Sequence, residues 1–329
     1  MNLYEFLYSI MVHISLMTLI YIILISFLVY YIYSSIIEYW FTKNGEISYD
    51  FFMNYAIQKV SKGNYFMNYG LWTGVSSGVS SGVSSGVSSG GADNLYTANK
   101  ALVSYILEKS GVLDKKDVKI LDVGCGYGEQ DFFWMSKLDK TNTLKAVDIS
   151  ADQINTAAEK CKRSDFASRL SFDVCDAMFL KSKFNDGEFD TVLSVESAFH
   201  YSNRPQFFQQ VHDILKSGGT FVISDIVLND SYRPGILNSS FLRTFSDFLH
   251  VPSVNHVTSA VWEKTIKDSG LAIVECIDIT DKTFNPYYKH FFNTYAKNNG
   301  LPAIIGSSAY NFLEYVQPFS YKIAVCKKD

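Results

Sequence analysis

Ile120-Leu-Asp-Val-Gly-Cys-Gly-Tyr-Gly128 is the stretch that decides the fold class of this chain. The apolar run 118–123 is typical of a short buried strand, and Asp122 stands at its end. Glycines follow at every second position: Gly124, Gly126 and Gly128. Because glycine tolerates tight turns and lets a ligand come close to the backbone, we expect a ligand-binding turn directly after this strand.

Strand-like and helix-like segments alternate around the glycine turn. Further strands are expected at 144–148, 170–175, 189–195, 220–226, 272–279 and 321–326. Helical spacing of apolar residues marks 94–109, 130–138, 151–163 and 206–215. This alternation predicts an α/β, Rossmann-like fold in which a parallel sheet carries helices on both faces.

Two more acids stand where expected strands end, at the edge where open α/β sheets bind ligands. Asp148 lies 20 residues after Gly128, a position from which a carboxylate can accept both hydroxyls of a ribose. Asp176, followed by Ala177, ends the next strand and can accept the exocyclic amine of an adenine. The pattern therefore predicts an adenosine-containing ligand.

The spacing of the glycines separates two classes of such ligands. A dinucleotide fingerprint is G-x-G-x-x-G, whereas this turn is G-x-G-x-G with Glu129 directly after it and Asp131 close behind. Acids there are poor neighbours for two phosphates, but they suit a cosubstrate that carries a sulfonium and an ammonium group. An NAD-dependent oxidoreductase is the less favoured alternative.

At this point the chain resembles the class I S-adenosylmethionine-dependent methyltransferases over residues 60–230. The segments that carry the resemblance are 120–128, 144–149, 174–177, 189–195 and 215–219. More narrowly, 126–134 and 195–201 resemble a group that modifies lipids, sterols, tocopherol-like quinols and polyketides, including the phthiotriolone-type lipid O-methyltransferases. Residues 65–72 resemble the lid motif of the same group.

The resemblance implies a seven-stranded sheet with S-adenosylmethionine as cosubstrate. Its implied binding residues are Asp122, Gly124, Cys125, Gly126, Gly128, Gln130, Asp148, Ile149, Gln153, Asp176, Ala177 and Glu196, together with Tyr65, Tyr69 and Trp72 of the lid. The lid aromatics can attract a sulfonium through their ring faces, or they can form a packed aromatic cluster; both interpretations stay open.

Two residues are candidates for the chemical step. His200 follows the fourth expected strand, and its ordinary pKa suits a general base, although a histidine in a turn can equally serve as a cap or pack. Asp225 ends the fifth strand, where an acid in related O-methyltransferases works with such a histidine; a turn cap is the alternative. Aromatics at 287–292 form either an acceptor wall or a cover over the sheet.

The N-terminal segment predicts a membrane anchor. Residues 6–37 contain no Asp, Glu, Lys or Arg. As a helix, 14–37 would be about 36 Å long, which exceeds the roughly 30 Å of a bilayer core. The aromatic residues at the end of this segment resemble the belt that membrane proteins place at the interface: Tyr30, Tyr31, Tyr33, Tyr39 and Trp40. We expect residues 1–40 to anchor the chain as a single-pass membrane protein whose catalytic domain faces the cytosol; a buried helix is the alternative.

The rest of the chain divides by composition. Residues 41–73 are expected to form a helical lid region, and 74–92 a low-complexity loop that contains four Val-Ser-Ser-Gly units. Residues 93–329 form the expected methyltransferase domain. A net charge of −4 gives no reason to expect a nucleic acid partner, and five cysteines without a C-x-x-C pair give none to expect a metal.

These features together predict methyl transfer from S-adenosylmethionine to a hydrophobic small molecule or lipid. Oxygen is slightly favoured over carbon or nitrogen as the accepting atom, and the predicted anchor favours an acceptor in a membrane. The alternative from another class is a membrane-tethered protein that keeps the fold without transferring methyl groups. It is motivated by the repeat expansion beside the lid motif. The sequence gives no oligomeric state.

Overall fold

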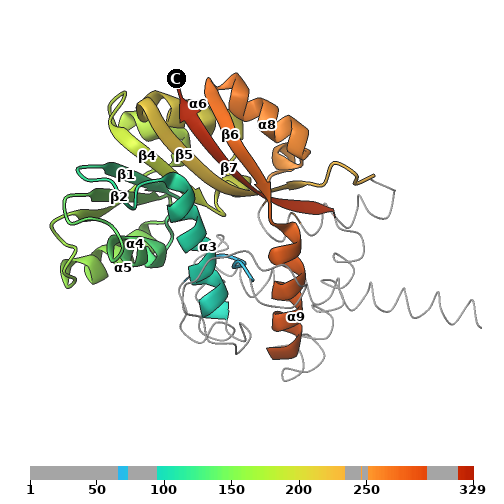
Figure 1. Cartoon of the computed structure of the whole chain (residues 1–329), viewed down its shortest axis with the longest axis horizontal. Helices are drawn as coiled ribbons and strands as arrows, with labels where there is room; N and C mark the ends of the chain where they lie inside the picture. Colours follow the sequence, from blue (N-terminus) through green and yellow to red (C-terminus); the bar gives the residue numbers. More distant parts are fainter. Residues whose placement is uncertain (1–65, 73–94, 234–245, 247–250, 295–317) are drawn as a thin grey trace, which may run out of the picture. The chain divides into compact units, whose positions relative to one another are not determined.

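The computed structural model describes residues 66–72, 95–233, 246, 251–294 and 318–329. They belong to one compact unit, residues 57–329. Its centre is a seven-stranded sheet in the order β3-β2-β1-β4-β5-β7-β6 (Figure 1). The strands are β1 (Lys119–Val123), β2 (Thr143–Asp148), β3 (Leu170–Val174), β4 (Phe189–Val195), β5 (Leu215–Leu228), β6 (Leu271–Asp278) and β7 (Phe319–Lys328).

The seven predicted strands are confirmed, but the prediction of a parallel sheet is wrong for one of them. β7 lies between β5 and β6 and runs antiparallel to both. The other neighbouring pairs, β3-β2, β2-β1, β1-β4 and β4-β5, are parallel. The periodicity of apolar residues marks a strand without giving its direction, so the sequence pattern carried no signal for this reversal.

Helices follow most of the strands, at positions close to those predicted. The α-helices are α3 (Leu95–Ser110), α4 (Glu129–Met135), α5 (Ala151–Lys162), α6 (Arg204–Ile214), α8 (Ser259–Asp268) and α9 (Phe284–Thr294). Short 3₁₀ turns are η1 (Ala177–Ser182), η2 (Ala198–His200), η3 (Ser253–Asn255) and η4 (Thr280–Lys282).

Local sequence explains where these helices begin. The Ser150 hydroxyl accepts the backbone N–H of Gln153, which caps α5. The Asn203 side chain caps α6 in the same way, with Pro205 in the first turn of the helix. α4 begins instead directly after Gly128, whose backbone is left-handed.

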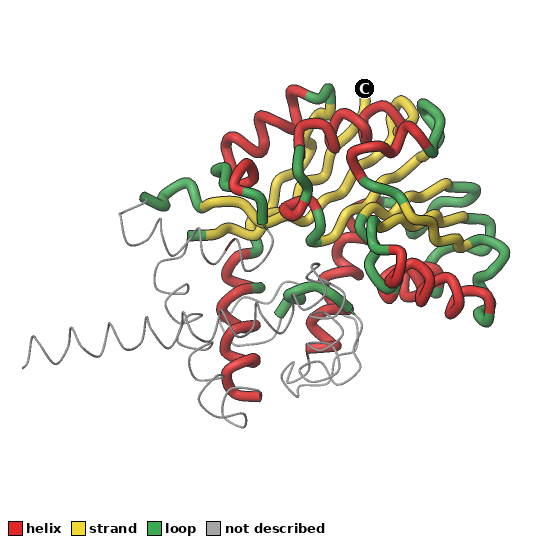
Figure 2. The backbone as a smooth tube through the Cα atoms, turned by 180° about the vertical axis from the view of Figure 1, so that it is seen from behind, coloured by secondary structure: helices red, strands yellow, loops and turns green. Residues whose placement is uncertain are grey.

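Helices cover both faces of the sheet, as predicted (Figure 2). On one face α3, α4 and α5 contribute Ile106, Trp134 and Ile154 to a core that meets Ile120 of β1. On the other face α6 and α8 bury side chains such as Phe207 and Trp262 against β4 and β5. Complete burial of such large apolar side chains is the main stabilising contribution to the sheet.

The strand order locates the functional edge. The chain moves outward in one direction from β1 to β2 and β3, and then in the other from β4 to β5. The reversal lies between β1 and β4, and in open α/β sheets ligands bind at the carboxyl ends of strands beside such a reversal. The glycine turn follows β1 and therefore lies at this point.

The structure corrects the predicted localisation. Among the residues that it describes, no helix is long and apolar enough to cross a membrane. The stretch that suggested an anchor, residues 1–40, lies outside those residues. We therefore withdraw the prediction of a single-pass membrane protein with its catalytic domain facing the cytosol.

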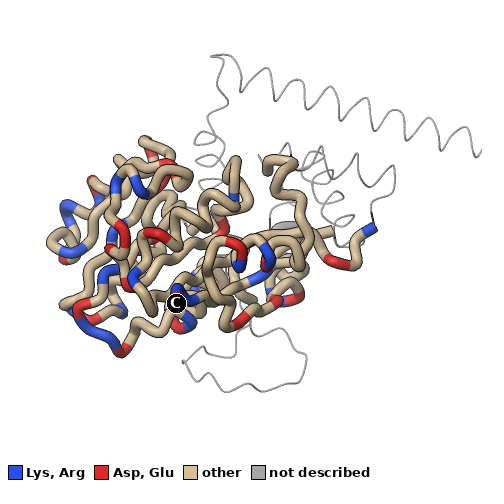
Figure 3. Tube along the Cα trace, turned by 90° about the horizontal axis from the view of Figure 1, so that it is seen from above, with Lys and Arg blue, Asp and Glu red and all other residues tan. Residues whose placement is uncertain are grey.

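The other predicted N-terminal parts are only partly covered by the structure. Residues 66–72 of the predicted lid region contain no helix, while 41–65 and the repeat loop 74–92 lie outside the described residues. Basic and acidic residues are interspersed along much of the described trace (Figure 3).

Candidate functional site

The glycine turn is held against β2 by backbone hydrogen bonds. The N–H groups of Gly124 and Cys125 both donate to the carbonyl of Val147, at 2.8 and 3.1 Å. Gly124 has a left-handed φ of 83°, and a Cβ placed on it would lie 2.3 Å from the Cβ of Ser197. No side chain fits there, so glycine is needed at this position both for its backbone angle and for its close packing.

Asp148 fixes the turn from the neighbouring strand. One carboxylate oxygen accepts the N–H of Gly126 at 2.9 Å, and the other accepts the N–H of Ser150 at 3.0 Å. The carboxylate is half-buried at the end of β2. The residue predicted to bind a ribose therefore lies directly beside the glycine turn and in a defined orientation.

The expected adenine site combines an acid with exposed apolar side chains. Asp176 caps η1 by accepting the N–H of Met178 at 2.9 Å, and Ala177 is buried behind it. Ile149 is 69% exposed and Phe179 is 58% exposed. Exposed apolar side chains at the ends of β2 and β3 offer a surface that a flat apolar base would cover.

Beneath the turn lies a buried acidic pair. Asp122 and Asp131 are fully buried, and Gln130 donates to the Asp122 carboxylate at 2.7 Å. Burial raises the pKa of Asp122 to about 7, and burial beside Asp122 raises that of Asp131 well above its ordinary value. Gln130, predicted as a cosubstrate ligand, thus supports Asp122 from inside the protein.

Glu196 is the most strained residue of the site. It follows β4 with a left-handed φ of 49°, which is uncommon for a residue with a side chain. Its carboxylate accepts the N–H of Tyr69 at 2.8 Å and the hydroxyl of Tyr321 at 2.5 Å. Burial raises the pKa of Glu196 to about 8, and burial next to Glu196 raises that of Tyr321. Strain held in place by several partners is common at functional sites.

Residues 66–72 pack over the glycine turn. A Cβ placed on Gly126 would meet the sulfur of Met67 at 3.1 Å and the side chain of Gln153 at 3.2 Å. Leu71 donates from its backbone to the carbonyl of Ala98 in α3, and Trp72 to that of Lys282 in η4. This segment therefore joins the turn, α3 and η4. Tyr65 lies outside the described residues.

The two described lid aromatics belong to a packed cluster. The ring of Tyr69 meets Phe284 and Tyr287 edge-on, with centroids 5.4 and 4.7 Å away. Trp72 is buried, and its ring lies 5.1 Å from that of His290. Of the two interpretations left open by the sequence, this geometry favours the aromatic cluster for Trp72, whereas Tyr69 also borders a pocket.

That pocket opens where β4 and β5 end. It holds about 470 Å³ of empty space, including the part open to solvent. Residues 226–228 of β5 form one wall, and Ser246, Asn255 and His256 supply polar groups. Aromatic side chains form most of the rest: Tyr69, Phe199, Phe284, Tyr288 and Phe319. Its mostly apolar lining with a few polar groups is typical of a site for a small organic molecule.

The predicted catalytic histidine stands beside this pocket, and a second histidine stands in its wall. His200 is half-buried at the end of η2, with its ring 4.1 Å from that of Phe199, a lining residue. His256, for which the sequence suggested no partner, lines the pocket itself. In the sequence, His256 lies far from the glycine motif, and no motif marked it as a pocket residue.

Asp225, the second predicted catalytic residue, lies inside a buried hydrogen-bond network. The residue is fully buried; its carboxylate accepts hydrogen bonds at 2.9 Å from both the Arg204 guanidinium and the indole N–H of Trp262. Arg204 also donates to the carbonyl of Asn255, next to His256 in the chain. These groups enclose the acid and connect it through Arg204 to the segment before His256; its catalytic role stays a prediction.

The structure thus brings most of the predicted site residues together. The glycine turn, Asp148 and Gln153 lie at the ends of β1 and β2, and Glu196 follows β4. Three contributors were missed: Arg204, His256 and Tyr321. They carry no motif, and their partners are distant in sequence, so only the folded chain shows their contacts.

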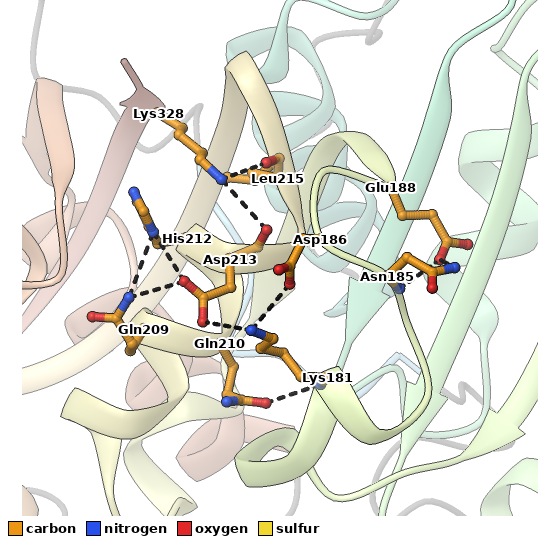
Figure 4. Close-up of polar contacts among 10 residues, drawn as sticks. All are labelled: Lys181, Asn185, Asp186, Glu188, Gln209, Gln210, His212, Asp213, Leu215 and Lys328. Carbon is orange, nitrogen blue, oxygen red and sulfur yellow. Dashed lines mark hydrogen bonds and ion pairs between the residues drawn. The ribbon is translucent and has the colours of Figure 1, made fainter.

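A second polar cluster lies at the opposite ends of the strands from the glycine turn, around the amino ends of β4 and β5 (Figure 4). Lys181 contacts Asp186 at 3.0 Å and Asp213 at 3.4 Å. Lys328 of β7 donates to the carbonyl of Leu215 at 2.9 Å. These groups are partly exposed, and they join elements instead of lining a pocket.

Comparison with known proteins assigns the family. A family model described as a methyltransferase domain matches residues 114–276. The erythromycin 3''-O-methyltransferase of Saccharopolyspora erythraea is 32% identical over 204 residues, which are 61% of this chain and 65% of that protein. This chain belongs to the class I S-adenosylmethionine-dependent methyltransferases. The family prediction, with the cosubstrate that defines the family, is confirmed.

Other relatives of the methyltransferase differ in the atom that they methylate. A sterol 24-C-methyltransferase of Neurospora crassa is 26% identical over 192 residues, 58% of this chain and 48% of that protein. The chain covers less than two thirds of the length of both relatives. Among solved structures, geranyl diphosphate C-methyltransferase from Streptomyces coelicolor A3(2), in complex with S-adenosyl-L-homocysteine, has a TM-score of 0.60 at 18% identity, over 72% of this chain and 82% of that one. That likeness concerns the fold.

Proposed function

We propose that this methyltransferase moves the methyl group of S-adenosylmethionine to a hydrophobic small molecule or lipid, with oxygen favoured as the accepting atom. The observation that carries the proposal is the apolar pocket at the ends of β4 and β5, which shares Tyr69 with the segment over the glycine turn. A cosubstrate on the turn and an acceptor in the pocket would then meet beside Glu196 and Tyr69.

The cosubstrate half rests on the fixed groups around the turn. Asp148 is held where it can accept the ribose hydroxyls, Asp176 lies where it can accept an adenine amine, and Ile149 offers an exposed apolar surface to the base. The acids near the turn, Asp122 and Glu196, suit a cationic methionine group. Glu129 contributes less than its position suggests, because Lys160 pairs with it at 2.5 Å.

The acceptor half rests on the chemistry of the pocket lining. Aromatic rings and the aliphatic side chains of residues 226–228 favour an apolar molecule. Methyl transfer from a sulfonium is an in-line displacement, so the walls contribute mainly by fixing position and alignment. An acceptor hydroxyl must also lose a proton as the new C–O bond forms, and a histidine within reach can take it.

We propose that His256, in preference to His200, accepts this proton. His256 lines the pocket, whereas His200 stands one residue behind the lining residue Phe199. Arg204 and Asn255 support the segment that carries His256: Arg204 donates to the Asn255 carbonyl at 2.7 Å, and the Asn255 amide donates to the Phe199 carbonyl at 2.9 Å. This arrangement makes Asp225 and Arg204 positioning residues for the acceptor side.

The first experiment tests the cosubstrate. Isothermal titration of the full chain with S-adenosylmethionine should give saturable binding, which should weaken strongly in Asp148→Ala and little in Asp152→Ala, an exposed control on α5. Binding of NAD without binding of S-adenosylmethionine would contradict the proposal and favour the oxidoreductase alternative.

The second experiment tests transfer. Methyl-labelled S-adenosylmethionine is incubated with the full chain and fractionated lipid and hydrophobic small-molecule extracts, and labelled products are separated together with S-adenosylhomocysteine. A labelled apolar product supports the proposal, and its structure gives the accepting atom. Cosubstrate binding without any S-adenosylhomocysteine would favour the non-catalytic alternative.

The labelled acceptor then separates the two histidines. We expect His256→Gln to lower kcat at least about tenfold with little change in cosubstrate affinity, because a general base acts only in the chemical step. His200→Gln should have the smaller effect. The reverse order would return the role of base to His200.

A further inference from the structure

Two acids beneath the glycine turn lack the partners that buried acids normally have. Asp122 ends β1, and Asp131 lies in the first turn of α4. Both side chains are fully buried, and each carboxyl lies within hydrogen-bonding reach of the other. Apart from that contact, one oxygen of Asp122 accepts from Gln130, while its other oxygen and both oxygens of Asp131 accept no hydrogen bond from any other residue that the structure describes.

Two carboxylates cannot both be charged in such a place. Ionising the second one brings a like charge into hydrogen-bond contact inside a region that water does not reach. Among the described residues, the other titratable groups with the largest effects on the pair are Asp148 of β2, Cys125 of the turn, Cys161 of α5 and Tyr201 after β4. None of these is a cation, so none compensates a second negative charge.

Asp131 is the member that keeps a proton. Burial and the neighbouring Asp122 both raise its pKa well above the ordinary value. Asp122 receives the Gln130 hydrogen bond in addition, which favours its charged form and counteracts the rise of its pKa, which lies at about 7. A hydrogen bond between two carboxyl groups also requires a proton on one of them.

We propose that Asp131 is a neutral carboxyl that donates a hydrogen bond to Asp122, and so sets how readily Asp122 becomes negative when the cationic cosubstrate binds at the turn. This inference rests on the proposed function for its ligand. The only bond that breaks is the O–H bond of Asp122, and that proton goes to solvent. Asp131 acts through Asp122 and is therefore a positioning residue.

The consequence is a proton-linked affinity. A nearby cation favours the charged form of Asp122, so binding releases a proton wherever the free protein still holds it. Below the pKa of the free protein, affinity should rise by up to about tenfold per pH unit, and it should level off above that pKa. The linked change in protonation is centred near neutral pH, where the cosubstrate must bind.

Two substitutions separate a proton donor from a negative charge at position 131. Asp131→Asn keeps a neutral donor, so the midpoint of the pH dependence should move by less than about 0.5 pH unit. Asp131→Leu removes the donor, so the midpoint should rise by at least about one pH unit. If Asp131 were charged in the wild type, Asp131→Asn would instead remove a like charge and lower the midpoint by more than about one unit.

The test is titration of the full chain with S-adenosylmethionine from pH 6 to pH 8.5, in two buffers with different ionisation enthalpies, so that released protons are counted directly. Asp152→Asn, an exposed acid on α5, serves as the control and should match the wild type. Binding that is independent of pH, or proton release that Asp131→Asn shifts downward, overturns the proposal.

A second measurement needs no ligand. The infrared spectrum of wild type minus Asp131→Asn at pH 8 should contain the C=O band of one protonated carboxyl, and absence of that band also overturns the proposal. Failure of the proposed function looks different, because the band would be present while S-adenosylmethionine failed to bind at any pH. Circular dichroism checks that Asp131→Leu folds, and Asp131→Asn keeps the test decisive if it does not.

Discussion

The pKa values of acidic side chains are shifted in opposite directions at the two ends of the strands. At the carboxyl ends of β1 and β4, burial raises the pKa of Asp122 to about 7 and that of Glu196 to about 8. At the amino ends of β4 and β5, the pKa of Asp190 and that of Asp213 lie below their ordinary values. Partial burial works against that lowering, but hydrogen bonds outweigh it, from Lys216 to Asp190 and from His212 to Asp213.

This contrast indicates which polar groups take part in function. At the amino end, Asp190 pairs with Lys216, and Asp213 pairs with Lys181 (Figure 4 shows the second pair), so the charged form of these partly exposed acids is their stable form. The acids of the carboxyl end are held in a place that disfavours their charge. Proteins retain such groups mainly where a ligand or a reaction uses them. Substitutions at the two ends should therefore behave differently.

Removal of the buried cation should have the largest effect. Arg204 and Asp225 are 3% and 0% exposed, and Arg204→Ala leaves the Asp225 charge buried without its cation. We expect a loss of about 3–5 kcal/mol in the free energy of unfolding, measured by urea denaturation. The double variant Arg204→Met/Asp225→Asn should recover much of this loss. A loss as small as that of a surface ion pair would show that Asp225 does not depend on Arg204 to stay buried.

A methyl group added to the glycine turn should come next. Gly124→Ala forces a left-handed alanine against Ser197, and should lower the free energy of unfolding by about 2–4 kcal/mol and abolish cosubstrate binding. Gly218 at the other end of the sheet is the matched control, because its φ is 74° and nothing lies within 4 Å of its Cβ position. Gly218→Ala should lose only about 1–2 kcal/mol and keep binding. Equal losses of unfolding free energy in the two variants would show that the close packing of Gly124 against Ser197 has no effect on stability.

Neutralising Glu196 should change how stability depends on pH. Because its pKa is raised to about 8 in the folded state, the folded protein holds a proton that the unfolded chain releases near its ordinary pKa. Stability from this group is therefore complete at low pH, and it falls by about 1.4 kcal/mol per pH unit as pH rises toward 8. In urea denaturation at pH 6, 7 and 8, Glu196→Gln should reduce the measured slope by this amount, while the contributions of Asp122 and Asp131 remain. Glu275→Gln, at an exposed pair with Lys109, should leave the slope unchanged.

Breaking a pair in the amino-end cluster should have the smallest effect. Lys181 reaches Asp186 and Asp213 across a partly exposed surface. Water and salt screen such pairs, so Lys181→Ala should leave the thermal midpoint and cosubstrate affinity within experimental error. A clear loss of binding would contradict the separation between the two ends.

The sequence predicted the fold well because the fold depends on local patterns. All seven strands, four helices and the glycine turn follow from apolar periodicity and from the positions of glycine and acid residues near 120–128. The direction of β7 did not follow, because the same alternation fits either direction. Tertiary pairing with β5 and β6 decides it.

The sequence predicted only the part of the site that surrounds the glycine turn. Asp148 and Glu196 lie next to recognisable motifs, so their positions could be read from the chain. The role of Asp225 could not, because its partners Arg204 and Trp262 lie 21 and 37 positions away. The left-handed backbone of Glu196 was equally hidden, since nothing in its side chain favours that conformation.

The position of β7 has a consequence for how the protein is made. Tyr321, the residue that donates to Glu196, belongs to the last of the described strands to leave the ribosome, yet that strand pairs between two earlier ones. Until it emerges, the nascent chain exposes unpaired edges of both β5 and β6, a state that is prone to aggregation. The methyltransferase would thus acquire its buried Glu196 contact and its protection from self-association in the same late step of synthesis.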